Sequence, residues 1–264
     1  MSLINSFFFK FERQFDNELA KTWLSEQWNY SIFYVGVYLF VIFELKHLME
    51  NRDRLNIDKF LAAWNTTLAA FSIIGTFRTF PELFRTLTET GFYESICDSS
   101  YVATNRVTGT WMFLFVLSKF MELGDTIFLV LKKRPLTFLH VYHHIVGLLY
   151  TWYSYIEFSS TTRWFSVMNF IVHSIMYTYF ALSAMKYKPP KQFAMMLTGL
   201  QIIQMIIGCI INLTIYGFFI RNIDCQVTMC NVILSSIMYA SFLFMFSKFF
   251  MNAYIRKAMK RKAV

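Results

Sequence analysis

The sequence predicts an all-α integral membrane protein with seven transmembrane helices, on the evidence of its composition, its apolar runs and the placement of its basic residues. Hydrophobic side chains make up 56% of the 264 residues and charged ones 16%, with a mean hydropathy of +0.42. An average soluble domain is about 25% charged. A spanning helix needs about 20 residues, so seven spans take about 140. The remainder is too short for a second domain, and residues 1–264 are predicted to form a single transmembrane domain.

Seven apolar runs give the positions of the predicted spans. They cover residues 30–46, 60–77, 110–131, 138–156, 164–185, 193–220 and 229–251. Pro81, Pro135, Pro189 and Pro190 fall between these runs, where residues that interrupt helices are expected. Residues 1–29 mix aromatic and charged side chains and lack the basic start and cleavage site of a signal peptide. We expect this segment to be an uncleaved tail that lies in the membrane interface.

Lysine and arginine residues are unevenly divided between the two sides of such a bundle. With seven spans, the side of the N-terminus receives 8 of the 25 basic residues and the opposite side receives 15, while Lys119 and Lys248 lie within spans. Basic residues concentrate in cytosolic loops, so the C-terminus is predicted to be cytosolic and the N-terminus lumenal or extracellular. Six spans, the alternative, divide the basic residues less cleanly. The net charge of +9 is thereby explained by topology and by lipid or anionic substrates, without a nucleic-acid partner.

Two of the four cysteines fall in the predicted non-cytosolic connections. Cys97 lies between the second and third spans, and Cys225 lies between the sixth and seventh. This side is oxidising if the membrane is that of the endoplasmic reticulum, and a Cys97–Cys225 disulfide is expected to tie the two connections together. Two unrelated thiols, and pairing with Cys230, are the alternatives.

Four consecutive predicted spans carry polar side chains. These are Lys119, Glu122 and Asp125 in the third span, His140, His143 and His144 in the fourth, Asn169, His173 and Tyr177 in the fifth, and Gln201 and Gln204 in the sixth. An ionisable residue inside a span is costly unless it has a partner or a function. The i, i+3, i+4 spacing puts the three histidines on one helical face. At about 1.5 Å per residue, these polar stripes share one layer in the cytosolic half, and we interpret that layer as chemically active.

Histidine clusters are typical of metal sites, and His-x-x-His-His segments also occur in membrane di-iron desaturases and hydroxylases. A metal-dependent membrane oxidoreductase is therefore one hypothesis, but such sites need more histidines than the five present here. The spacing also fits three zinc ligands less well than a His-Glu-x-x-His helix does. Metal-free use of histidine as nucleophile and as acid or base is the preferred hypothesis. A seven-span transporter or receptor is a third, and Lys119 with Glu122 also fits a purely structural ion pair.

Four blocks of residues resemble the signature blocks of a known family. Lys119-Phe-Met-Glu122-Leu-Gly-Asp125-Thr126, His140-Val-Tyr-His143-His144, Asn169-Phe-Ile-Val-His173-Ser-Ile-Met-Tyr177 and Thr198-Gly-Leu-Gln201 are similar, in order and spacing, to those of the very-long-chain fatty acid elongases. These are the condensing 3-ketoacyl-CoA synthases of the endoplasmic reticulum. The flanking segments are most similar to the subfamily that acts on saturated and monounsaturated acyl-CoAs of the palmitate range. Phe180 departs from the tyrosine found there in many members, which bears on chain preference only.

The resemblance implies a seven-helix fold in which six helices surround a closed-ended acyl tunnel, with no metal or other cofactor. It also implies that His143 takes the acyl group from acyl-CoA as an acyl-imidazole. Malonyl-CoA then loses CO2 and attacks the acyl carbon, which gives a 3-oxoacyl-CoA two carbons longer. We expect large side chains at the closed end of the tunnel to set the chain length.

Further roles follow from the same resemblance. His173 is expected to act on malonyl-CoA or to polarise the thioester carbonyl. His140 and His144 are expected to orient His143 or to donate to the oxyanion. Asp125 and Glu122 are expected to fix the tautomers of the histidines. Lys119, Asn169, Tyr177 and Gln201 are expected to contact substrate, and Lys132, Arg134 and Lys188 to meet the phosphates of CoA at the cytosolic mouth. Basic residues at this mouth equally satisfy the positive-inside rule.

The C-terminal residues look like a retrieval motif of the endoplasmic reticulum. Lys260 and Lys262 form a Lys-x-Lys-x-x ending on the predicted cytosolic side, although the same charges also suit lipid headgroups. We therefore expect a multi-pass protein of the endoplasmic reticulum membrane. Besides the lipid bilayer, the resemblance implies the ketoreductase, dehydratase and enoyl reductase of the elongation cycle as partners, and it leaves a homodimer open.

Overall fold

The computed structural model describes residues 9–256, and every regular element in that range is helical. The helices are α1 (Lys10–Gln14), α2 (Asn17–Glu26), α3 (Ser31–Met49), α4 (Asp58–Glu89), α5 (Phe92–Cys97), α6 (Tyr101–Thr104), α7 (Arg106–Glu122), α8 (Gly124–Leu131), α9 (Phe138–Ile156), α10 (Thr162–Ala184), α11 (Lys191–Ile220) and α12 (Met229–Phe250). A 3₁₀ turn, η2 (Trp28–Tyr30), precedes α3, and a π-helical turn, η3 (Met251–Ile255), follows α12. The retrieval motif at Lys260 and Lys262 lies outside the described residues.

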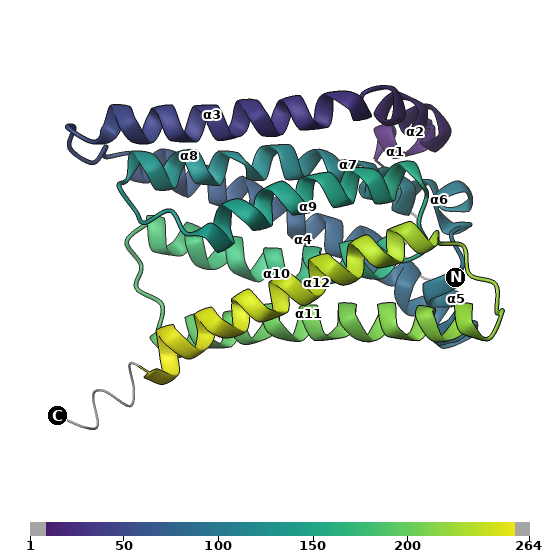
Figure 1. Cartoon of the computed structure of the whole chain (residues 1–264). Helices are drawn as coiled ribbons and strands as arrows, with labels where there is room; N and C mark the ends of the chain where they lie inside the picture. The colour runs from purple at the N-terminus through teal and green to yellow at the C-terminus, as the bar shows by residue number, and fades with distance from the viewer. Residues whose placement is uncertain (1–8, 257–264) are drawn as a thin grey trace.

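Five helices within the described range are long and apolar enough to cross a membrane, namely α3 with η2, α4, α10, α11 and α12 with η3. The other helices of the bundle, α7, α8 and α9, fall short because α7 and α8 are too short individually and because α9 carries three histidines. Figure 1 shows α8 and α7 following one another in a line beside α3, with α9 next to α7. The architecture is that of an all-α integral membrane protein.

The predicted third span, 110–131, consists of two helices in the structure. α7 and α8 meet at Leu123, whose amide donates to the Phe120 carbonyl at 3.2 Å, three residues back instead of four. Such 3₁₀ tightening commonly marks a helix end. A Cβ atom at Gly124 would lie 2.7 Å from the Trp64 ring of α4. The expectation of one continuous helix is therefore wrong, because the close approach of α4 shapes this junction.

The second predicted span also differs, since α4 continues past residue 77 and through Pro81. A proline inside a helix removes a backbone hydrogen bond and costs about 3 kcal/mol. Contacts of the following turn offset this cost, because Glu82 pairs with Arg163 of α10 at 3.1 Å and Leu83 is buried. The expectation that all four prolines lie between spans is wrong for Pro81, where tertiary packing holds the helix together.

The described part of the N-terminal segment is folded against the bundle. α1 and α2 pack on α7, and α2 also packs on α9. Glu12 of α1 is fully buried and accepts hydrogen bonds from Arg78 Nε at 2.9 Å and from Trp111 Nε1 at 2.8 Å. A buried carboxylate needs partners of this kind. These contacts, which the sequence did not predict, fix the segment to α4 and α7.

A disulfide joins the end of α5 to the loop between α11 and α12. Cys97 and Cys225, 128 residues apart, form this bond, whereas Cys230 is free. Beside the bond, the Gln226 amide donates to the Cys97 carbonyl at 2.9 Å. Arg163, which is 1% exposed, donates to a carbonyl of α5 at 2.9 Å. This end of the bundle is therefore held by a covalent bond, by backbone hydrogen bonds and by charge.

Removal of the disulfide is expected to lower the stability of the fold. A cross-link across a long loop restricts the unfolded chain and typically contributes about 2–4 kcal/mol. The Cys97→Ser/Cys225→Ser double variant should melt at a lower temperature in detergent than the wild type, whereas Cys230→Ser, which removes a free thiol, should not. A double variant that melts together with the wild type would show that this connection adds no stability.

Candidate active site

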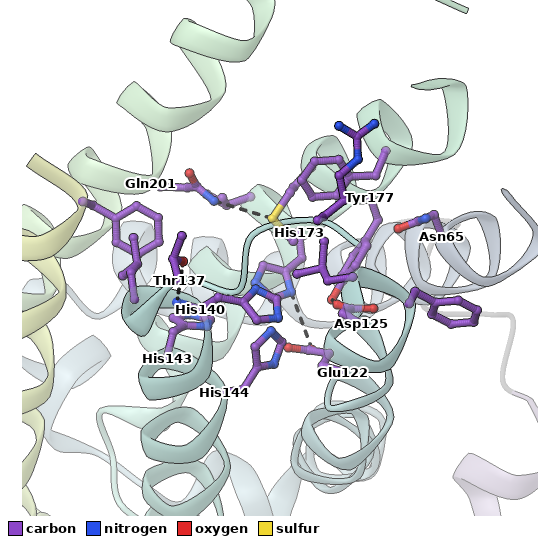
Figure 2. A pocket seen from close by; sticks show the side chains of 18 of the residues that line it. Asn65, Glu122, Asp125, Thr137, His140, His143, His144, His173, Tyr177 and Gln201 are labelled. Atoms are coloured by element: carbon purple, nitrogen blue, oxygen red, sulfur yellow. Dashed lines mark hydrogen bonds and ion pairs between the residues drawn. The ribbon is translucent and has the colours of Figure 1, made fainter. Parts of the chain in front are cut away.

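A cavity of about 470 Å³ lies among α4, α7–α8, α9, α10, α11 and α12. Its wall contains most of the polar residues predicted for the bundle interior: His140, His143, His144, His173, Glu122, Asp125, Asn169, Tyr177, Gln201 and Gln204. Figure 2 shows the labelled histidines, Glu122, Asp125, Tyr177 and Gln201 converging from several helices. Asn65 of α4 adds an amide that the sequence analysis did not single out. The structure therefore brings together side chains that are distant in the sequence.

The three histidines of α9 form one contiguous group. α9 begins beside Thr137, whose hydroxyl accepts the His140 amide at 3.3 Å and so caps the helix. The ring centroids of His140 and His144 are 4.4 Å apart, and those of His143 and His144 are 5.5 Å apart. His143 also packs against the Phe242 ring of α12, with centroids 4.9 Å apart. The ring of His143 therefore has an apolar neighbour on one side and an imidazole on the other.

His173 lines the same cavity from α10, and a chain of hydrogen bonds holds its ring. Lys119 Nζ donates to Glu122 Oε1 at 2.7 Å and to Asn169 Oδ1 at 2.8 Å. Because the Asn169 oxygen accepts from Lys119, the Asn169 amide nitrogen is the donor to His173 Nε2, at 3.1 Å. A neutral His173 then carries its proton on Nδ1, which lies 3.6 Å from Glu122 Oε1 (Figure 2). The predicted function of Glu122 in fixing a tautomer agrees with this geometry.

The ion pair between Lys119 and Glu122 is almost completely buried, with the two residues 7% and 4% exposed. Lys119 Nζ also lies 4.4 Å from the centroid of the Phe115 ring. Lys119 does not line the larger cavity but lines a smaller one next to it, and its expected contact with substrate stays a prediction. Its ammonium group is occupied by Glu122, Asn169 and the aromatic ring, as in the structural alternative considered from the sequence.

Asp125 is held by two donors from different helices. Trp64 Nε1 of α4 donates to Asp125 Oδ1 at 2.7 Å, and the Tyr177 hydroxyl of α10 donates to Asp125 Oδ2 at 2.7 Å. The hydroxyl proton of Tyr177 is therefore directed at Asp125, away from any substrate in the cavity. The contact with Trp64 was not predicted, although a tryptophan N–H inside an apolar helix needs an acceptor.

The two glutamines of α11 occupy different positions in the wall. Gln201 has a long contact from its amide nitrogen to Met176 Sδ, at 3.5 Å, which leaves most of its donor capacity facing the cavity (Figure 2). Gln204 is buried and lines the larger cavity and a smaller one next to it. The Gln204 side chain therefore borders the site from two sides.

The basic residues expected at the cytosolic mouth differ in their placement. Lys132 and Arg134 line the cavity, and Lys132 forms an ion pair with Asp58 at the start of α4. Lys188 is exposed and is not part of the cavity wall. Two of the three predicted residues therefore border the larger cavity, and one of those two already has an acidic partner.

A smaller cavity of about 60 Å³ lies on the other side of the histidines. It shares Glu122, His143, His144, Asn169, Gln204 and Met205 with the larger cavity. Its remaining wall is mostly aromatic or apolar, with Phe115, Tyr150, Phe165, Met238 and Tyr239 displaced toward the disulfide end of their helices. His143 and His144 therefore border both a wide chamber and a narrow, mostly apolar one.

No group of three or more His, Cys, Asp or Glu side chains within residues 9–256 is arranged to hold a metal ion. Nε2 of His140 lies 2.9 Å from the Thr126 hydroxyl, and Nε2 of His173 accepts from Asn169. The site thus offers oriented imidazoles, a buried carboxylate and amide donors, which are the groups used in nucleophilic and acid–base catalysis.

The fold is an apolar helical bundle, and its interior holds a site of imidazole, carboxylate and amide groups. The protein is therefore of the class of all-α membrane proteins with an enzyme-like centre. The family described as ELO: GNS1/SUR4 family matches residues 23–262, and the chain belongs to that family. A protein named very long chain fatty acid elongase 6 from Drosophila melanogaster is 50% identical over 81% of this chain and 67% of its own length. The protein of the same name from Gallus gallus is 42% identical, over 83% and 82%. Very long chain fatty acid elongase 3 from Mus musculus is 40% identical, over 74% and 72%.

Loss of Lys119 is expected to destabilise the protein strongly. Lys119→Met leaves the Glu122 carboxylate buried without its cation, which costs about 3–5 kcal/mol. The thermal unfolding temperature in detergent should fall, and Lys119→Met/Glu122→Leu should recover part of the loss because no charge is then left unpaired. Lys248→Met is the matched control, since Lys248 lies in α12 and is exposed. A Lys119→Met protein that unfolds with this control would contradict the structural assignment.

Proposed function

We propose that the chain is the condensing enzyme of microsomal fatty acid elongation, a 3-oxoacyl-CoA synthase that joins a long-chain acyl-CoA to malonyl-CoA. The observation that carries the proposal is the position of His143, whose side chain borders both cavities. A nucleophile at that junction can hold an acyl group that extends toward the apolar chamber while a second substrate occupies the wide one. Membership of the ELO family supports fatty acid elongation in general.

The reaction proceeds in two steps at His143. A ring nitrogen attacks the thioester carbon of acyl-CoA, the carbon–sulfur bond breaks, and the ring proton passes to the CoA thiolate as it leaves. Malonyl-CoA then loses CO2, and its α-carbon forms the new carbon–carbon bond as the acyl–nitrogen bond breaks. The imidazole regains a proton from solvent. The products are CoA, CO2 and a 3-oxoacyl-CoA two carbons longer.

The neighbours of His143 have supporting functions in this cycle. Phe242 covers one side of its ring with apolar surface, which excludes water from the acyl-enzyme. His144 and His140 continue the imidazole group on the other side and orient the nucleophile or donate to the oxyanion. His173 acts on the malonyl-CoA, with its tautomer fixed by Asn169.

The architecture proposed for this function has seven spans. α7 with α8, and α9, join the five long apolar helices as the third and fourth spans. Six of the seven contribute side chains to the larger cavity and α3 contributes none, which supports a tunnel enclosed by α4 and α7–α12. The N-terminus is lumenal and the C-terminus cytosolic, in agreement with the excess of basic residues on the latter side.

The ends of the tunnel have different chemistry. Lys132 and Arg134 border the cytosolic end, where the phosphates of CoA arrive. Tyr150, Phe165 and Tyr239 border the far end, where the acyl chain stops. Substrates of the palmitate range, residence in the endoplasmic reticulum and cooperation with the other enzymes of the elongation cycle complete the proposal.

Replacement of His143 tests the proposed nucleophile. His143→Ala should lose at least 100-fold of malonyl-CoA incorporation, because no other step supplies the acyl-enzyme, and intact-mass spectrometry should detect an acyl adduct only on the wild type. His47→Ala, at the exposed cytosolic end of α3, is the control and should keep both signals. A folded His143→Ala protein with substantial activity would overturn the assignment.

Filling the smaller cavity tests how chain length is set. An added Cβ at Gly147 meets no atom within 4 Å, so Gly147→Leu places its side chain in the apolar chamber without a backbone clash. Products should become shorter by two or more carbons, because each methylene excluded from the chamber loses about 0.8 kcal/mol of burial. Chromatography of the products from a panel of acyl-CoAs measures this change.

Gly217→Leu is the matched control, because Gly217 also has open space around an added Cβ and lies outside both cavities. Tyr239→Ala, which enlarges the same chamber, should shift the products in the opposite direction. Unchanged product lengths in both chamber variants would count against a steric stop at this position.

A further inference from the structure

The outermost helix, α3, reaches the catalytic histidines through one side chain. Figure 1 shows α3 at the edge of the bundle, where it packs chiefly on α8, and most of its side chains are exposed. Tyr38 is an exception at 6% exposed, and its hydroxyl lies 2.7 Å from Thr126 Oγ1 of α8. Thr126 is fully buried, and its hydroxyl lies 2.9 Å from His140 Nε2. Neither Tyr38 nor Thr126 lines the cavity.

This chain of three groups has a preferred direction. A threonine hydroxyl carries one hydrogen, so between two partners it donates to one and accepts from the other. A phenol, with a pKa near 10, is a stronger donor and a weaker acceptor than an aliphatic alcohol. Tyr38 therefore donates to Thr126, and Thr126 donates to His140 Nε2. The ring proton of His140 is then on Nδ1.

We propose that Tyr38 is a positioning residue, which acts through Thr126 to fix the tautomer and orientation of the His140 ring. This inference rests on the proposed function, in which the imidazoles of α9 are catalytic. Without the Tyr38 hydroxyl, Thr126 is free to donate to a backbone carbonyl three or four residues back and to accept from His140 instead. Both tautomers of His140 then become accessible.

The consequence reaches the nucleophile through ring contacts. His140 lies against His144 with ring centroids 4.4 Å apart, and His144 lies against His143 at 5.5 Å. When the proton of His140 moves from one ring nitrogen to the other, the dipole of the His140 ring changes direction. The neighbouring rings of His144 and His143 then experience a different electrostatic field. The first transmembrane helix therefore contributes to catalysis although it contributes nothing to the tunnel wall.

Tyr38→Phe removes only the hydroxyl, and Tyr34→Phe is its matched control. Tyr34 lies one turn earlier on α3 and packs by its ring on Phe120 and Trp152. Steady-state assays with malonyl-CoA and palmitoyl-CoA should give kcat about 5- to 10-fold lower for Tyr38→Phe, the size of effect expected for one hydrogen bond. KM should stay within about twofold for both substrates, because Tyr38 touches neither, and Tyr34→Phe should match the wild type.

Two further measurements separate positioning from general destabilisation. The Tyr38→Phe/Thr126→Val double variant should lose no more activity than Thr126→Val alone, since both act through one chain. Solid-state ¹⁵N spectra of histidine-labelled protein in liposomes report the tautomer directly, and the His140 signal is assigned by its loss in His140→Gln. The wild type should carry the proton on Nδ1, and Tyr38→Phe should show both tautomers.

The proposal is overturned if wild-type His140 is protonated on Nε2, or if Tyr38→Phe keeps the activity and spectrum of the Tyr34→Phe control. Additive losses in the double variant would also overturn it. These outcomes are distinct from a failure of the proposed function, which would appear as an active His143→Ala enzyme while the tautomer spectra stayed unaffected.

Discussion

The candidate site depends on a buried ion pair and the hydrogen bonds that extend from it. Lys119 and Glu122 near the end of α7 pair with each other, and Asn169 of α10 links the lysine to His173. The two charges both lie on α7, and the charge-assisted hydrogen bond from Lys119 to Asn169 holds α7 and α10 in one register. The same pairing makes Asn169 a donor to His173, which fixes its tautomer. Packing and chemistry are therefore determined by a single set of contacts.

The sequence predicted those parts of the fold and site where the alternation of polar and apolar residues allows one interpretation. The fourth span was predicted at residues 138–156 and α9 has those bounds, because proline and basic residues flank it on one side and a polar loop follows. The histidines of α9 share one face since helical periodicity requires it. The broken third span and the continuation of α4 through Pro81 were missed, because each depends on a neighbouring helix that local sequence does not specify.

Contacts between helices were the other part that sequence could not supply. The chain has fifteen tyrosines and six tryptophans, and many of those in the helices have a hydrogen-bond partner on another helix. Which of them approach a polar partner depends on helix rotation and crossing, as for Trp64 at Asp125 and Tyr38 at Thr126. Composition alone indicates that a buried N–H or O–H needs an acceptor. It does not identify that acceptor, so these residues emerge only once the bundle is assembled.

The two ends of the bundle differ in how firmly they are held, and this difference matches the proposed chemistry. At the far end, the Cys97–Cys225 bond and the buried Arg163 join several segments. At the opposite end, the polar links include the partly exposed Lys132–Asp58 pair. Local stability follows the density of buried contacts. In the proposed function, the wall that limits the acyl chain must be rigid, whereas the mouth that exchanges two CoA esters must open. The disulfide and the contacts of Arg163 lie at the end for which the proposal requires rigidity.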